Sequence, residues 1–381
     1  MRATHLHSLN SKCLIFTILT AFNVSTTHSF QIIAHRGASG IYPTHTVEAY
    51  REGAKFADLI ECDLALTRDL RLVCLHYSWI NATTNVHKVF GESRSETRVW
   101  GGGRKTDYFT MDFSLEELKT LGKVQERDYR DQSFNEKFQI SSFQEYLNVA
   151  VEFGVGVYPE TKEPHDFNKW IQEELGLNTT YEEILMNEIW ENQKFIDSNL
   201  ECWFQSFDKN SAKKLAEIST YSNSKFVYLQ STIPNTKTVD DLVASNVTYL
   251  GISKDNILKK DSFNRIKSNL NDELVNLKEN HGVKGVHLYT FRNEDQFIPF
   301  DFKQDFRQEV EFYLKNVTAV DGAFCDFSES VRGVLDGFFE VNEVTTEDVE
   351  TTTESLVSSE VDFRFGNFML FGLFVVFGAC Q

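Results

Sequence analysis

Short apolar runs alternate with amphipathic stretches along the chain from about residue 30 to residue 336. Short apolar runs bounded by turn residues predict buried strands, whereas apolar residues spaced three and four apart predict helices. The predicted strands cover residues 30–35, 58–63, 71–76, 154–160, 202–207, 225–230, 248–252, 285–289 and 322–326. About eight strands separated by helices predict an α/β fold of the (β/α)8 type, the TIM barrel.

Capping residues mark several helix starts. The S-x-x-E pattern of a capping box begins at Ser114 and at Ser142. Thr44 is the expected N-cap of an earlier helix. Further helices are expected over residues 210–218, 262–279 and 304–315.

Residues 77–139 interrupt the strand–helix rhythm. The segment is polar and contains three consecutive glycines at 101–103. Connections of this length are usually functional or disordered. We expect an insertion that lies over the C-terminal face of the barrel and covers the substrate.

Glu61 and Asp63 stand two positions apart at the end of the strand predicted over 58–63. Residues i and i+2 of a strand point to the same face, so the two carboxylates lie side by side. Such a pair repels unless a cation lies between, and hard divalent ions such as Ca²⁺ or Mg²⁺ prefer oxygen ligands. The pair is a candidate metal site. The alternative is two acids that face solvent on an edge strand.

Other predicted strands also end in polar residues. His35 and Arg36 follow the strand 30–35, His76 ends another, and Glu160 ends the strand that leads to Lys162. Active sites of parallel barrels lie at the C-terminal strand ends. Histidines there suggest acid/base catalysis, Glu160 a third metal carboxylate, and the two cations phosphate binding. The alternatives are structural histidines and a surface ion pair.

The charge balance excludes one class of partner. The formal net charge is −18, from 38 Lys and Arg against 56 Asp and Glu. Nucleic acid binding needs a basic face, so nucleic acid is not expected as a partner. An anionic substrate needs a local cation or metal in order to reach its site.

Both ends of the chain have the pattern of processing signals. Residues 1–29 join Arg2 and Lys12 to an apolar run and small residues, which is typical of a secretory signal peptide. An uncleaved anchor is the alternative, although the apolar run is short for a membrane span. Residues 337–360 form a Thr/Ser/Glu-rich stalk, and the apolar stretch 361–381 resembles a GPI-attachment signal, with a marginal transmembrane end as the alternative. We expect a protein that is secreted or lipid-anchored on the outer face of the plasma membrane.

N-glycosylation sequons support the secretory route, although each tripeptide is weak evidence alone. They begin at Asn81, Asn178, Asn246 and Asn316.

Four cysteines lie between the two terminal signals, and they allow three pairings if oxidised. They are Cys62, Cys74, Cys202 and Cys325. In the strand alternation Cys62 faces away from the inward acids, whereas Cys74 shares the parity of His76. This argues against a Cys62–Cys74 bridge, and buried free thiols are the alternative to any pairing.

Several short motifs occur in a specific order on successive strands. They are His35-Arg-Gly-Ala-Ser-Gly40, Tyr42-Pro-Thr-His-Thr46, Glu61-x-Asp63, Leu75-His76, Pro159-Glu-Thr-Lys162, Gln205-Ser-Phe-Asp208 and Val320-Asp-Gly-Ala-Phe-Cys-Asp326. Together they resemble the glycerophosphodiester phosphodiesterase family, most closely its bacterial periplasmic branch, over about residues 32–334. Each motif alone is weak, but the ordered set is specific.

The resemblance implies a TIM barrel that hydrolyses glycerophosphodiesters with one Ca²⁺ or Mg²⁺. The implied roles are acid/base catalysis by His35 and His76, metal binding by Glu61, Asp63 and Glu160, and substrate binding by Arg36, Lys162, Gln205 and Tyr289. Attack by the substrate's own neighbouring hydroxyl would release sn-glycerol 3-phosphate and a free alcohol from a compound such as glycerophosphocholine. A lysophospholipid is a second possible substrate class, and no protein partner is inferred.

The sequence departs from the family pattern at three positions. Thr44 stands in place of an acid, Tyr77 in place of an Asp, and Ala82 in place of an Arg. None of these changes removes a predicted metal ligand or histidine. They leave substrate orientation and head-group preference open.

Two other functions remain open. A sphingomyelinase D-like phospholipase D has a related barrel with paired histidines and a Glu-x-Asp motif, but Glu160-x-Lys162 resembles the glycerophosphodiesterase strand instead. A non-catalytic surface protein could have kept the barrel for binding. The presence of both histidines and all three acids argues against this.

Overall fold

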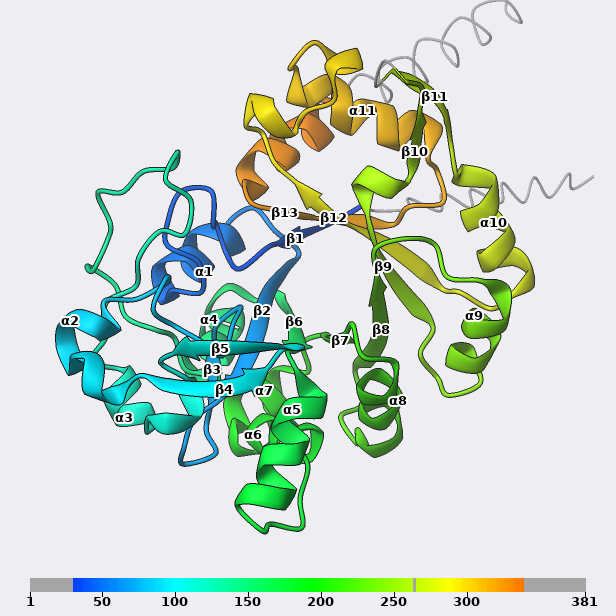
Figure 1. Cartoon of the computed structure of the whole chain (residues 1–381). Coiled ribbons are helices and arrows are strands. Elements are labelled where there is room, and N and C mark those ends of the chain that lie inside the picture. Colours follow the sequence, from blue (N-terminus) through cyan, green and yellow to red (C-terminus); the bar gives the residue numbers. More distant parts are fainter. Residues whose placement is uncertain (1–29, 263–264, 339–381) are drawn as a thin grey trace, which may run out of the picture.

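The computed structural model describes residues 30–262 and 265–338 and shows a barrel of strands with helices around its outside (Figure 1). The strands of its main sheet are, in chain order, β1 Gln31–Ala34, β2 Leu59–Leu66, β3 Leu72–Cys74, β6 Gly156–Thr161, β7 Cys202–Ser206, β8 Ser224–Gln230, β9 Tyr249–Ser253, β12 Gly285–Phe291 and β13 Gly322–Cys325. Two antiparallel hairpins lie outside this sheet: β4 Glu96–Trp100 with β5 Gly103–Asp107, and β10 Leu258–Lys260 with β11 Ile266–Asn269.

The main sheet closes on itself. Among the described residues its nine strands have the order β1-β13-β12-β9-β8-β7-β6-β2-β3, and β1 also pairs with β2. This extra pairing closes eight parallel strands into a barrel and leaves β3 outside it. The predicted (β/α)8 barrel is therefore confirmed.

Helices follow most of the barrel strands. Within the described ranges they are α1 Val47–Ala54, α2 Val86–Phe90, α3 Leu115–Leu118, α4 Phe143–Phe153, α5 Pro164–Lys169, α6 Tyr181–Glu191, α7 Gln193–Ser198, α8 Lys209–Ile218, α9 Thr236–Val243, α10 Asn271–Asn280, α11 Phe306–Asn316 and a last helix over 328–338. Both predicted capping boxes are present, at the starts of α3 and α4. The N-cap of α1 is Thr46 rather than the predicted Thr44, whose hydroxyl instead donates a hydrogen bond to Glu126 at 2.6 Å.

The helix predicted over 262–279 is shorter than expected. Its C-terminal part is α10, which begins at Asn271, and the β10–β11 hairpin precedes it. Apolar spacing in a short segment does not by itself separate a helix from a hairpin, because the pairing partner decides between them.

The interior of the barrel is filled in layers. Leu59, Tyr158 and Phe324 belong to a buried apolar cluster there. Two positions further along the same faces, Leu59 is followed by Glu61 and Tyr158 by Glu160. An apolar layer therefore closes the barrel, and a polar layer lies beyond it at the C-terminal ends of the strands.

The strand predicted over 71–76 is not a barrel strand. β3 pairs antiparallel with β2, with Leu66 opposite Leu72 and Leu64 opposite Cys74. The turn between them is short, and short turns join antiparallel strands because a parallel connection needs a long crossover. The chain leaves the sheet after Cys74 and carries His76 beyond it.

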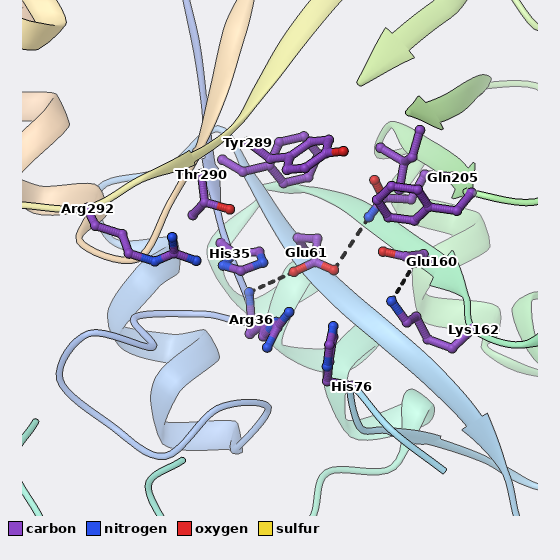
Figure 2. A pocket seen from close by; sticks show the side chains of 13 residues that line it. His35, Arg36, Glu61, His76, Glu160, Lys162, Gln205, Tyr289, Thr290 and Arg292 are labelled. Atoms are coloured by element: carbon purple, nitrogen blue, oxygen red, sulfur yellow. Dashed lines mark hydrogen bonds and ion pairs between the residues drawn. The ribbon is translucent and has the colours of Figure 1, made fainter. Parts of the chain in front are cut away.

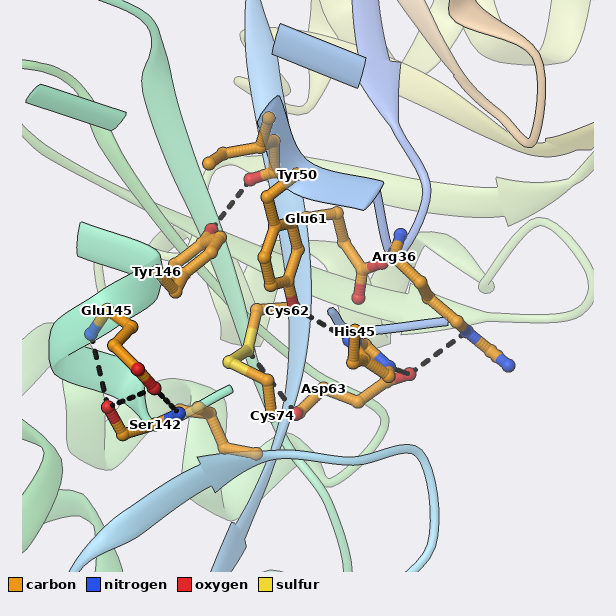
Figure 3. The surroundings of a disulfide bond; sticks show 12 residues. Arg36, His45, Tyr50, Glu61, Cys62, Asp63, Cys74, Ser142, Glu145 and Tyr146 are labelled. Atoms are coloured by element: carbon orange, nitrogen blue, oxygen red, sulfur yellow. Dashed lines mark hydrogen bonds and ion pairs between the residues drawn. A yellow bond between two sulfur atoms is a disulfide. The ribbon is translucent and has the colours of Figure 1, made fainter. Parts of the chain in front are cut away.

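Cys62 and Cys74 form a disulfide with their Cα atoms 5.7 Å apart (Figure 3). The prediction against this bridge was wrong because it treated both segments as regular barrel strands. In the antiparallel hairpin Leu64 stands opposite Cys74, so Cys62, two residues earlier, lies on the same face as Cys74. The free cysteines of the described residues are Cys202 and Cys325, and both are buried.

The segment 77–139 contains the hairpin of β4 and β5 together with the short helices α2 and α3. Its last part reaches the C-terminal end of the barrel, where Arg130 donates a hydrogen bond to Asp326 at 2.6 Å. This contact places the insertion at the face that the sequence predicts.

The predicted signal peptide, nearly all of the stalk and the GPI-like signal lie outside the described residues. No helix within 30–262 and 265–338 has the length and apolar character needed to cross a membrane.

Candidate active site

A cavity of about 230 Å³ opens at the C-terminal ends of the barrel strands (Figure 2). The predicted site residues that line it are His35, Arg36, Glu61, His76, Glu160, Lys162, Gln205 and Tyr289. Asp63, the remaining predicted residue, lies beside the cavity with its carboxylate against those of Glu61 and Glu160. The ends of five barrel strands and the segment after β3 thus bring residues far apart in the sequence to one place.

Glu61, Asp63 and Glu160 form a buried carboxylate cluster. One oxygen from each lies within 4.8 Å of the others, and Asp63 stands opposite Glu160 across the β2–β6 pair. Burial and the charge of Asp63 raise the pKa of Glu61 well above its usual range, and burial raises that of Glu160 to about 8. A cation among these oxygens would relieve the repulsion, and three carboxylates suit a hard divalent ion. The cluster could therefore hold a metal.

Arg36 and Lys162 face the same carboxylates. Arg36 Nε lies 3.1 Å from Asp63 Oδ2, and Lys162 Nζ lies 2.8 Å from Glu160 Oε1 and 3.7 Å from Asp63 Oδ1. Although burial opposes ionisation of Asp63, the charges of Arg36 and Lys162 hold its pKa well below its usual range. Acids and cations together form a compact polar site in which a phosphate can meet both a guanidinium and an ammonium group.

His35 is held through its side chain. Its Nδ1 lies 2.6 Å from Asp326 Oδ1, and Asp326 Oδ2 accepts hydrogen bonds from Arg130 at 2.6 Å and from Arg292 at 2.8 Å. Burial raises the pKa of Asp326, but the hydrogen bond and charge of His35 and the two arginines hold it well below its ordinary value. Ionised Asp326 accepts a hydrogen bond from Nδ1–H of His35, which leaves the Nε2 lone pair to face the cavity.

The pKa of His35 is lowered from 6.5, first by burial and then by the neighbouring charge of Arg36, while Asp326 raises it. The imidazole is therefore neutral near pH 7. A neutral ring with one nitrogen held by a carboxylate is suited to accept a proton at the other nitrogen.

His76 lies in the same cavity but is held in another way. Its Nδ1 is buried and has no hydrogen-bond partner in the described part of the chain. The ring of Tyr77 stands edge-on to it, with centroids 4.1 Å apart. Burial, followed by the charge of Arg36, lowers the pKa of His76 well below its usual range. The position of this imidazole therefore depends on its backbone and on packing against Tyr77.

His45 is a site residue that the sequence analysis did not assign. It is fully buried, with Nδ1 2.8 Å from the Tyr50 hydroxyl and Nε2 3.0 Å from Asp63 Oδ2 (Figure 3). Burial lowers the pKa of His45 to about 4, so the ring is neutral. Because ionised Asp63 only accepts, His45 donates from Nε2 and accepts at Nδ1 from Tyr50. This chain of hydrogen bonds fixes the orientation of the Asp63 carboxylate.

Glu126 is a second unassigned residue, and it comes from the insertion. Its Oε1 accepts the hydrogen bond from Thr44, and its Oε2 lies 3.7 Å from Arg36 Nη1. Thr44 is a position at which the sequence departs from the family pattern by lacking an acid. The insertion brings a carboxylate to that place.

Gln205 and Tyr289 lie where the sequence predicts them, on the cavity wall. Gln205 Nε2 is 3.4 Å from Glu61 Oε1, and its Oε1 is buried without a hydrogen-bond partner in the described residues. The ring of Tyr289 packs edge-on against Phe207, with centroids 5.8 Å apart. The wall thus offers a carboxamide oxygen and aromatic surface to a ligand.

The sequence holds a signal for some of the unassigned residues but not for others. Asp326 ends the last barrel motif, two positions after inward-facing Phe324, so strand parity could have identified it. His45 lies within the Tyr42–Thr46 motif. Arg130 and Glu126 lie in an irregular stretch, where no periodic pattern indicates which way a side chain points.

The fold and the site together define a class of enzyme: a TIM barrel with two histidines beside an acidic cluster, organised to act on a phosphate ester. The model of the glycerophosphoryl diester phosphodiesterase family matches residues 35–330. The chain belongs to this family, and the predicted resemblance and enzyme class are confirmed.

Relatives agree with this assignment. The chain is 34% identical over 335 residues to a glycerophosphodiester phosphodiesterase of Arabidopsis thaliana, which covers 79% of this chain and 84% of the relative. One similar structure is an Oleispira antarctica phosphodiesterase solved in complex with the product sn-glycerol-3-phosphate. Its TM-score is 0.54 at 18% identity, and the match covers 80% of this chain and 96% of that one. A Silicibacter pomeroyi protein named as a glycerophosphoryl diester phosphodiesterase has a TM-score of 0.56 at 14% identity, and the match covers 81% of this chain and 94% of that one. The two structures are similar to this chain in fold.

Proposed function

We propose that the protein hydrolyses glycerophosphodiesters such as glycerophosphocholine to sn-glycerol 3-phosphate and an alcohol, with one Ca²⁺ or Mg²⁺. The observation that carries the proposal is that His35 and His76 line one cavity together with Glu61 and Glu160. The product bound to the Oleispira antarctica relative supports the same substrate class.

In the proposed mechanism His35 is the base and His76 the acid. Burial lowers the pKa of free His76, so we propose that it takes up its proton when the negative charge of the bound phosphodiester lies beside it. The substrate's neighbouring hydroxyl gives its proton to Nε2 of His35 as its oxygen bonds to phosphorus. The bond from phosphorus to the departing alcohol breaks, and His76 gives that oxygen a proton. Water then opens the resulting cyclic phosphate while the two histidines exchange roles, which restores both protonation states.

The charged residues of the site supply the electrostatic part of the proposal. Arg36 and Lys162 bind the phosphodiester anion and stabilise the charge that grows on its oxygens in the transition state. Glu61, Asp63 and Glu160 would hold the divalent cation, which adds Lewis-acid stabilisation of the same charge when bound.

We further propose that the chain enters the secretory pathway through residues 1–29 and receives a lipid anchor in place of residues 361–381. The disulfide supports an oxidising compartment, since such bonds rarely persist in the cytosol. The sequon asparagines are all exposed, which leaves them open to glycosylation: Asn81, Asn178, Asn246 and Asn316.

The test is release of glycerol 3-phosphate from glycerophosphocholine by the secreted protein with Ca²⁺, with Mg²⁺ and with EDTA. We expect release with a divalent cation, at least about 100-fold less with EDTA, and a similar loss in Asp63→Asn. Choline release from lysophosphatidylcholine or sphingomyelin, without glycerol 3-phosphate from glycerophosphocholine, would move the protein to the phospholipase D class. Inactivity on all three substrates would support a binding protein.

A further inference from the structure

The disulfide between Cys62 and Cys74 lies next to both parts of the active site. Cys62 stands between Glu61 and Asp63 on β2 and is bonded to Cys74 (Figure 3). Cys74 ends β3, two residues before His76. The bond therefore joins the strand that carries two of the metal-site acids to the segment that carries one catalytic histidine.

We propose that this disulfide positions His76 for acid/base catalysis. It would fix the short segment 74–76 against β2 and so hold the imidazole at a constant distance from the acidic cluster. The inference rests on the proposed function, because it assumes that His76 belongs to the acid/base pair.

The two strands that the bond joins are supported unequally. β2 pairs on one side with β1, through Leu59 and Ile60, and on the other with β6. β3 has three residues, and among the described strands it pairs only with β2. Its other side makes an isolated bridge from Val73 to Ser142 and two hydrogen bonds, from Cys74 N to Ser141 O and from Leu72 N to Glu188. Loss of the disulfide would leave β2 held by the barrel but would loosen β3.

The segment after β3 is held by backbone hydrogen bonds that flank His76 but do not involve it, such as the one from Thr110 N to Ser78 O at 2.8 Å. The nearest backbone restraint is the hydrogen bond from Leu75 N to Asp63 O at 2.9 Å. The His76 ring itself has no hydrogen-bond partner at Nδ1 among the described residues. A catalytic group displaced by about 1 Å can lose on the order of 100-fold in rate, so a weakly held backbone would matter here.

The bond is a permanent structural disulfide rather than a redox switch. Cys62 and Cys74 are both fully buried, and the rings of Tyr50 and Tyr146 lie close to the bond (Figure 3). A reductant in solvent has no direct access to either sulfur. Only substitution removes the bond cleanly from the folded protein.

The test compares the full chain carrying Cys62→Ala and Cys74→Ala with a matched control, Cys202→Ala, which removes another fully buried cysteine. We expect the double variant to lose about 10- to 100-fold in kcat. KM for glycerophosphocholine and the affinity for Ca²⁺ should stay within about twofold of wild type, because β2 and β6 keep their pairing. Unchanged kcat, or a loss that appears in Ca²⁺ affinity instead, would overturn the proposal.

A double-mutant cycle shows whether the bond acts through His76. Removal of the disulfide should cost nothing further in a His76→Ala background but should keep its full effect in a His35→Ala background. Equal losses of kcat in both backgrounds would contradict the proposal. If the alanine pair does not fold, Cys62→Ala with Cys74→Val fills the space, and failure of both variants to fold would show that the bond serves the whole fold instead. Inactivity of wild type and Cys202→Ala would count against the proposed function, not against this inference.

Discussion

His35 and His76 lie in one cavity, yet the protein supports them by different means. His35 follows β1, inside the closed barrel, and its ring is held by Asp326, which two arginines hold in turn. His76 follows β3, outside the barrel, and its Nδ1 has no hydrogen-bond partner in the described residues. One histidine is oriented by charges and the other by its backbone.

Because the two histidines are held differently, substitutions near each one should disturb the reaction in different ways. Loss of a charge near His35 changes both the orientation and the pKa of that ring, because Asp326 raises the pKa of His35. Loss of a backbone restraint near His76 changes position alone. The insertion contributes to both arrangements: it supplies Arg130, which holds Asp326, and Tyr77, whose ring packs edge-on against His76.

The largest expected effect comes from removing either ring. His35→Ala and His76→Ala should each lower kcat by about 100- to 10,000-fold, the range for a group that transfers a proton in the transition state. KM for glycerophosphocholine should change little. His165→Ala, an exposed histidine on α5, is the control and should keep full activity. A loss of only a few fold in one of the two variants would remove that histidine from the acid/base pair.

Asp326→Asn should have the next largest effect, a loss of about 100-fold in kcat, since an amide no longer fixes the tautomer of His35. Asp326 raises the pKa of His35, so its loss should move the acid limb of kcat/KM to lower pH, because the base stays neutral further down. In a His35→Ala background the substitution should cost little more. An unshifted acid limb, measured on protein with intact thermal unfolding, would show that Asp326 does not act on His35.

Arg130→Lys should have the smallest effect, about fivefold in kcat. Lysine keeps the charge but loses the forked geometry with which Arg130 contacts Asp326 and Glu294. The control is Arg51→Lys, in an exposed pair with Glu152, which should leave activity unchanged. A loss as large as that of Asp326→Asn would mean that Arg130 contributes more than support for the carboxylate.

Strand alternation in the sequence was enough to find most of the site. Glu61 and Glu160 follow inward-facing residues two positions earlier, and the barrel places both on the cavity wall. Gln205 has the same parity, but it was assigned from the family resemblance. Alternation is a property of each strand alone, so it can be read without knowledge of the neighbours.

The same rule failed for Cys62 and Cys74. Whether the two side chains share a face depends on the direction and register of the partner strand. The antiparallel hairpin places both on one face, whereas the sequence predicted opposite faces. The helix predicted over 262–279 failed for a related reason, since part of it pairs as a hairpin instead.

The sequence by itself determined the barrel, the two histidines, the acidic cluster and the family, because each depends on local periodicity or on short ordered motifs. Only the tertiary structure decided the disulfide and the reach of Arg130 and Glu126 into the site. These contacts join segments whose own patterns do not specify a partner. Their formation depends on where the closed barrel places the ends of its strands.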